Sequence, residues 1–215
     1  MDFSIGFAKK SPEKILGKER FFPMKHEPLL LASASPRRAE LLTTAGIPFA
    51  CVPSHADELP SGSCSPDSLV VENARRKAAE VSARFPGRVV LGADTVVVSE
   101  GQALGKPRDR EDAKRMLYAL SGKTHQVMTG VCMTDGKRTE TALSVTYVTF
   151  RALDDALIER YVASGECDDK AGAYGIQGKG CVLVERLEGD YFGVVGLPVC
   201  TVDQMLSRFL FREKD

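Results

Sequence analysis

The sequence predicts an α/β fold in which helices flank a mixed β-sheet. Two observations lead to this prediction. Apolar runs of strand length alternate with helical periodicity in the first half of the chain, and a hairpin pattern appears in the second half. The 215 residues, 43% of them hydrophobic, can form one large domain or two small lobes around a cleft.

The first elements follow from apolar runs and helix boundary residues. Residues 28–33 (PLLLAS) have the length and composition of a strand. Ser35 and Pro36 then have the pattern of a helix N-cap and first turn, and Gly46 ends the helix. A second strand is expected over residues 47–53.

A polar loop over residues 55–63 separates this strand from a longer helix. The helix begins at Ser65-Pro66 and carries a buried stripe of Leu, Val and Ala to about Ala83. Residues 88–98 (RVVLGADTVVV) predict a strand with a Gly-Ala-Asp-Thr interruption, and a turn follows at Glu100-Gly101.

The second half of the chain predicts a helix, a hairpin and a mixed C-terminal region. Asp109 caps a helix that Gly122 ends, and Asp135-Gly136 is a typical hairpin turn between two strands. The remaining expectations are a short helix at 154–164, a glycine-rich loop at 171–180, two short strands, and a helix after Pro198.

The first 24 residues are expected to form a disordered N-terminal extension to a domain over 25–215. They lack clear periodicity, and Met24 precedes the first convincing strand.

Composition argues against several classes of protein. Lys plus Arg and Asp plus Glu are equal at 29 each, whereas a nucleic-acid-binding protein usually has a basic excess. No secretory signal is visible, and no stretch approaches the roughly 20 apolar residues that span a bilayer. The six cysteines include no CxxC pair, so we expect free thiols in the cytoplasm.

The strongest candidate for polyphosphate binding is the segment SASPRR at the start of the first helix. Ser33, Ser35, Arg37 and Arg38 are clustered where unpaired helix N–H groups favour an anion. The alternative is a capped helix with two solvated arginines.

Two acidic residues are candidates for catalysis or metal binding. Asp94 lies among valines, where an unpaired carboxylate is costly unless it contacts a cation. Its alternative is a strand-end Asp in a turn. Glu58 lies in the polar loop, where a solvated side chain is the more common situation.

Three further residues have side chains suited to nucleotide binding. Lys77 lies on the long helix, where a solvated face is the default, and Lys106 lies beside a proline in the short loop LGKP, which limits its freedom. Neither lysine is specific evidence by itself. Gln177 lies in a stretch with four glycines between 172 and 180, where an amide can pair with a base edge. A flexible surface loop is the alternative. The segment is neither a Walker A motif nor a Rossmann fingerprint.

Eight segments in order resemble the Maf family of nucleoside triphosphate pyrophosphatases. They are LLLASASPRRAELL, the DEL loop, ENARRKA, VLGADTVVV, LGKPRD, LSGKTHQVMTG, DKAGAYGIQGKG and VVGLPV. The resemblance implies a fold shared with inosine-triphosphate pyrophosphatases, with an elongated mixed sheet and two lobes around a cleft. It also implies a homodimer. The charge balance, the cysteines and the lack of a long apolar stretch give the further expectations of a cytoplasmic protein, no nucleic acid and no membrane among its partners.

The resemblance implies hydrolysis of a nucleoside triphosphate to the monophosphate and pyrophosphate with Mg²⁺ or Mn²⁺. Asp94 matches the family's proton acceptor, and Glu58 matches an acidic position expected to hold the metal. The residues expected to bind the phosphates are Ser33, Ser35, Arg37, Arg38, Lys77 and Lys106.

Arg37, Thr95 and Gln177 occupy the positions that distinguish the branches of the family. This trio resembles the branch that prefers dTTP and UTP, with modified pyrimidine nucleotides as further candidates. The 7-methyl-GTP branch, which has Trp, Gln and Glu there, is an alternative. A non-enzymatic role in septum formation through a binding partner is another, because the family is associated with arrest of that process.

Overall fold

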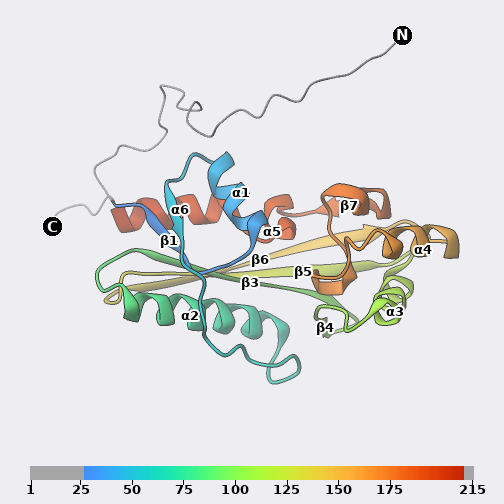
Figure 1. The fold of residues 1–215 in the computed structure, drawn as a ribbon, viewed down its shortest axis with the longest axis horizontal. Coiled ribbons are helices and arrows are strands. Elements are labelled where there is room, and N and C mark those ends of the chain that lie inside the picture. The colour runs from blue at the N-terminus through green and yellow to red at the C-terminus, as the bar shows by residue number, and fades with distance from the viewer. Residues whose placement is uncertain (1–26, 211–215) are drawn as a thin grey trace, which may run out of the picture.

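The computed structural model describes residues 27–210 and is built on a seven-stranded mixed sheet (Figure 1). The spatial order is β2-β1-β3-β5-β6-β7, and β4 pairs with β3. Strand β1 is parallel to both β2 and β3, and every other pairing is antiparallel. The strands are β1 (Leu29–Leu31), β2 (Phe49–Cys51), β3 (Val90–Ser99), β4 (Gln102–Leu104), β5 (Thr124–Thr134), β6 (Thr139–Phe150) and β7 (Val184–Glu188). The predicted α/β class is confirmed.

Helices cover both faces of this sheet. Figure 1 shows α2 along one face and α1, α5 and α6 on the opposite side, with α3 and α4 at the far end. The helices are α1 (Pro36–Thr44), α2 (Pro66–Arg84), α3 (Arg110–Leu120), α4 (Asp155–Ala163), α5 (Tyr191–Val195) and α6 (Val199–Leu210). None of them is both long and apolar enough to pass through a bilayer, as far as residues 27–210 are concerned.

Several details differ from the sequence prediction. The expected interruption at Gly92–Thr95 is absent, because β3 continues through these residues. The glycine-rich segment contains two short 3₁₀ helices, η1 (Ala171–Ala173) and η2 (Gly178–Leu183).

The second of the two short strands expected before Pro198 is instead helix α5. The Asp190 side chain accepts a hydrogen bond from the Phe192 N–H at the start of this helix, and Gly196 ends it with a φ of 128°. Capping therefore outweighs the strand preference of the aromatic and β-branched residues between them. The expected extension over residues 1–24 lies outside the described residues.

The apolar interior is divided into separate clusters. One packs α3, α4 and the 3₁₀ helices against the ends of β5 and β6. Another packs α1 and α6 against β1, β3 and β5. The long strands β3 and β5 join the two regions, which agrees with the expected arrangement of two lobes.

All six cysteines are free, as expected.

Helix α2 packs with its backbone directly against two glycines of the sheet. A Cβ on Gly92 would lie 2.2 Å from the Ala74 carbonyl oxygen, and one on Gly130 would lie 2.5 Å from the Val70 carbonyl oxygen. Neither distance is sterically tolerable, so the depth of α2 depends on these two glycines.

A buried histidine supports the far lobe beneath the glycine-rich segment. His125 on β5 is 2% exposed, and its Nε2 lies 2.8 Å from the Tyr174 hydroxyl. Its ring also makes edge-to-face contacts with Tyr174 and Phe150. Burial lowers the pKa of His125 from 6.5 to about 4. The histidine is therefore neutral and has a structural role.

We predict that Gly130→Ala destabilises the protein by roughly 1–3 kcal/mol, because the new methyl group overlaps the α2 backbone. Urea unfolding measures the change. Gly105→Ala is the matched control, because a Cβ there meets no atom within 4 Å. Equal stability of the two variants would contradict the tight packing of α2.

We predict a loss of stability between pH 6.5 and pH 4 that depends on His125. The unfolded chain protonates this side chain near pH 6.5, whereas the folded chain does so only near pH 4. The contribution of neutral His125 to the free energy of unfolding is therefore fully present above pH 6.5. Roughly 3 kcal/mol of it is lost as the pH falls to 4.

His125→Gln removes this titration, so its free energy of unfolding should fall less steeply over the same range. The exposed His55 provides the control variant His55→Gln, which should follow the wild-type curve. Parallel curves for His125→Gln and the wild type would contradict the prediction.

Candidate active site

The candidate site lies where one edge of β3 has no neighbouring strand. Strand β1 pairs with β3 at Val90 and Leu91, and β4 pairs with it only from Val97 onward. A cavity of about 680 Å³ opens beside the intervening residues and is lined by both lobes. Because no strand blocks this edge, Asp94 and Thr95 both line the cavity although they face opposite sides of the sheet.

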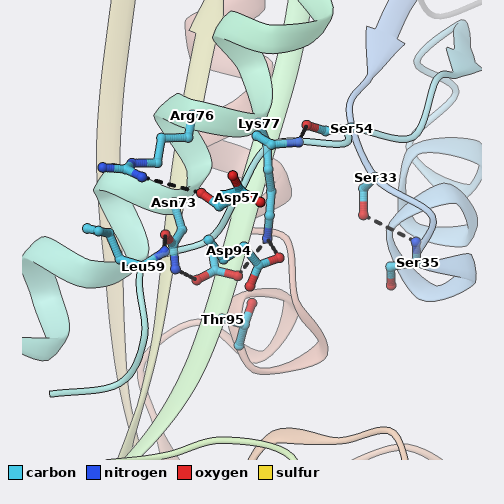
Figure 2. A network of polar contacts seen from close by, with 12 residues as sticks. Ser33, Ser35, Ser54, Asp57, Leu59, Asn73, Arg76, Lys77, Asp94 and Thr95 are labelled. Carbon is cyan, nitrogen blue, oxygen red and sulfur yellow. Dashed lines mark hydrogen bonds and ion pairs between the residues drawn. The ribbon is translucent and has the colours of Figure 1, made fainter. Parts of the chain in front are cut away.

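Asp94 is 9% exposed, and its carboxylate is held by helix α2 (Figure 2). Asn73 Nδ2 donates to Oδ2 at 3.1 Å, and Lys77 Nζ lies 2.9 Å from Oδ1. Asn73 and Lys77 are four residues apart, so they share one face of the helix. The turn-Asp alternative is thereby excluded, because Asp94 lies within a continuous strand.

The same two side chains also hold the polar loop over the site. Asn73 Oδ1 accepts a hydrogen bond from the Leu59 N–H at 2.8 Å, and Lys77 Nζ lies 2.8 Å from Glu58 Oε1. Glu58 and Asp94 therefore contact the same ammonium group. The Glu58 side chain is 56% exposed, whereas that of Lys77 is only 12% exposed, so Glu58 is the partner with more freedom to move.

Glu58 and Asp94 offer the oxygen donors that a hard divalent cation prefers. Within residues 27–210, no group of three or more His, Cys, Asp or Glu side chains is placed to hold a metal by itself. Two carboxylates completed by phosphate oxygens and water fit Mg²⁺, which seldom uses an all-protein cage. A cation between them requires Lys77 to release at least one carboxylate.

Arg38 is the most constrained cation of the cleft. Its Nε donates to the Gly196 carbonyl at 2.9 Å, Nη1 to Ser33 Oγ at 3.0 Å, and Nη2 to Thr95 Oγ1 at 3.2 Å. Burial lowers the pKa of Arg38, and the nearby Asp94 carboxylate opposes this effect. A guanidinium has five N–H donors, so two remain for an anion in the cleft.

The start of α1 does not show the expected side-chain cap. Ser35 has N-cap geometry, but its hydroxyl makes no capping hydrogen bond, and its own N–H donates to Ser33 Oγ at 3.2 Å. Both serines line the cavity. Arg37 is likewise not simply solvated, because its Nη1 lies 3.3 Å from Asp169 Oδ2 of the opposite lobe. The alternative of a capped helix with free arginines therefore does not fit.

The opposite wall carries the remaining predicted residues. Lys106 is exposed and Gln177 half-buried, and both line the cavity together with Tyr174. No side-chain hydrogen bond of Gln177 is found in the described part of the chain, which leaves its amide available. The structure thus places Asp94, Glu58, Thr95, Gln177 and all the predicted phosphate-binding residues around one cavity.

Sequence reasoning missed three residues that shape this site. Asn73 could have been found from its position one helical turn before Lys77. Asp169 precedes the glycine-rich segment, but no pattern indicates that it contacts Arg37 across the cleft. Thr129 lies beneath Thr95 on β5, and only the strand register reveals that pairing.

Comparisons with known proteins identify the family of this chain. Residues 28–209 match a family described as Maf-like protein. A dTTP/UTP pyrophosphatase of Symbiobacterium thermophilum is 50% identical over 181 residues, which are 84% of this chain and 93% of that protein. The dTTP/UTP pyrophosphatases of Bacillus pumilus and Bacillus anthracis are 48% and 46% identical over the same share of this chain, and the matches cover 96% and 95% of those proteins.

Proposed function

The chain belongs to the Maf family, and from this premise we propose that it hydrolyses dTTP and UTP to the nucleoside monophosphate and pyrophosphate. The observation that carries the proposal is a buried carboxylate, Asp94, beside a cavity lined by Arg37, Arg38, Lys77 and Lys106. Nucleophilic attack on a polyanion requires both a base and concentrated positive charge. The names of the similar proteins support the same reaction and the same substrates.

In the proposed mechanism, Asp94 accepts a proton from the water that attacks the α-phosphorus. Asn73 and Lys77 orient the carboxylate, so its direction is fixed before substrate binds. Arg38 directs its two remaining N–H groups to phosphate oxygens, and the free N–H groups at the start of α1 add to this field. Lys106 and Arg37 neutralise the pyrophosphate that leaves.

The proposal includes a divalent cation, Mg²⁺ or Mn²⁺, with Glu58 and Asp94 as its protein ligands. The cation supplies charge neutralisation and polarises the phosphate oxygens. With that cation in place, Lys77 would pair with a phosphate oxygen instead of Glu58, so its ammonium would stay paired. The exposed position of Glu58 allows this rearrangement without movement of β3 or α2.

Base preference is assigned to Gln177 and Thr95 on the cleft walls. An uncharged amide provides a donor and an acceptor, which suit the N3–H and carbonyl oxygens of uracil or thymine. A glutamate there would favour the N–H groups of a guanine instead. The trio of Arg37, Thr95 and Gln177 therefore supports pyrimidine substrates over 7-methyl-GTP, and modified pyrimidine nucleotides are further candidates.

We also propose a cytoplasmic homodimer with a catalytic domain over residues 25–215. The competing role in septum formation through a binding partner predicts a different response to mutation. Binding would survive the loss of Asp94, whereas hydrolysis would not.

We predict that Asp94→Asn lowers kcat for dTTP and UTP by about 10²–10⁴-fold, the range typical of a lost general base. Pyrophosphate release from dTTP, UTP, CTP, GTP, ATP and 7-methyl-GTP, with Mg²⁺ or Mn²⁺, measures both the reaction and its base preference. Asp67→Asn on the exposed first turn of α2 is the control and should retain the wild-type rate. Failure of the wild-type protein to release pyrophosphate from any of these nucleotides would sink the enzymatic proposal.

We predict that chelation of divalent cations abolishes hydrolysis and that added Mg²⁺ or Mn²⁺ restores it. Glu58→Gln should raise the Mg²⁺ concentration for half-maximal rate by about tenfold or more. Loss of a residue that only contacts a metal ligand already weakens metal binding by about this factor, and loss of a ligand should weaken it at least as much. Glu40→Gln, on the exposed surface of α1, should leave the titration unchanged. A wild-type metal requirement in Glu58→Gln would remove Glu58 from the ligand set.

A further inference from the structure

A chain of three hydroxyl and carbonyl oxygens lies beneath the cleft on the α1 side of the sheet. Thr95 Oγ1 on β3 lies 2.9 Å from Thr129 Oγ1 on β5, which lies 2.8 Å from the Gly193 carbonyl oxygen of α5. Thr129 is 0% exposed, so no solvent can take part in its hydrogen bonds. Each of the two short oxygen–oxygen distances therefore requires a proton between the atoms.

The direction of these hydrogen bonds follows from the number of available protons. The Gly193 carbonyl can only accept, so the single hydroxyl proton of Thr129 must point toward it. The proton between Thr129 and Thr95 then has to come from Thr95. Arg38 Nη2 donates to the same Thr95 oxygen at 3.2 Å. Thr95 therefore has no proton left for a ligand and offers only acceptor capacity to the cleft.

Ser33 has the opposite character. Its Oγ accepts hydrogen bonds from the Ser35 N–H and from Arg38 Nη1, which occupies both lone pairs. No hydrogen bond donated by the Ser33 proton is found among residues 27–210. The two hydroxyls that contact Arg38 thus differ, because Ser33 has a free proton for an anion and Thr95 does not.

We propose that Thr129 is a specificity-determining positioning residue that fixes Thr95 as an obligate hydrogen-bond acceptor for a donor group on the nucleoside. Phosphate oxygens and base carbonyls cannot pair with such a hydroxyl, whereas an O–H or N–H group can. This inference rests on the proposed function only for the nature of the ligand, a pyrimidine nucleotide.

The donor has to be common to dTTP and UTP if both are substrates. The 2′-hydroxyl is absent from dTTP, so two neutral donors remain, the 3′-hydroxyl of the sugar and the N3–H of the base. Both belong to the same chemical class, and analogues that lack one or the other distinguish them.

The experiment is calorimetric binding of α,β-methylene UTP, which lacks the hydrolysable bridge, and of its 3′-deoxy and N3-methyl counterparts. Wild-type protein should bind the parent nucleotide about five- to tenfold more tightly than one of the two counterparts, the range for one net hydrogen bond. Thr129→Val should reduce this preference to about twofold or less, because the Thr95 hydroxyl then loses the partner that fixes its proton and no longer presents only a lone pair to the ligand donor. Thr129→Ser keeps the hydroxyl and should keep the preference.

Thr95→Val gives an independent test, because it removes the acceptor without changing β5. It should lose the same preference as Thr129→Val. A purely steric penalty from the N3-methyl group would persist in both valine variants, so only the part that they abolish reports the hydrogen bond. Urea unfolding of each variant shows whether the fold is retained.

Equal binding of all three nucleotides by the wild type, or an undiminished preference in folded Thr129→Val, would overturn the inference. Neither result depends on turnover. Pyrophosphate release from UTP, measured separately, tests the proposed function. A Thr129-dependent preference without pyrophosphate release would support the inference and refute the proposed reaction. Pyrophosphate release without such a preference would support the reaction and refute the inference.

Discussion

The close contact between α2 and the centre of the sheet is the constraint on which the site depends. Gly92 and Gly130 allow the helix backbone to reach a depth that any side chain would prevent. At that depth, Asn73 and Lys77 reach the carboxylate of Asp94 and satisfy both of its oxygens. A buried carboxylate without such partners would be strongly destabilising. The packing of one helix thus determines whether the candidate base can exist in the strand.

Charge compensation explains the arrangement of the rest of the cleft. The ammonium of Lys77 contacts two carboxylates, and the guanidinium of Arg37 pairs with Asp169 across the cleft. These pairs neutralise charges that a nucleotide and a cation are proposed to engage. A polyanion can therefore replace the carboxylates as the partner of each cation, so binding need not leave any buried charge unpaired.

Much of the fold could be predicted from the sequence because the signals are local. Helix α3 follows from Asp109, whose side chain accepts from the Asp112 N–H, and the β5–β6 hairpin follows from Asp135-Gly136. The α/β class and the membership of the Maf family are both confirmed. The prediction was wrong for residues 191–195, where capping by Asp190 produced a helix. Strand β4 was missed because three residues carry too little periodicity.

The sequence by itself identified which residues are candidates for the chemistry, because unusual groups such as Asp94 and the SASPRR segment stand out from their neighbours. The tertiary structure alone decided how these groups are paired. The contact of Asn73 with Asp94, the bridge from Arg37 to Asp169, and the chain from Thr95 through Thr129 to Gly193 join residues far apart in sequence. Hydrogen-bond direction depends on which atoms are within reach, and strand register and helix depth set those distances.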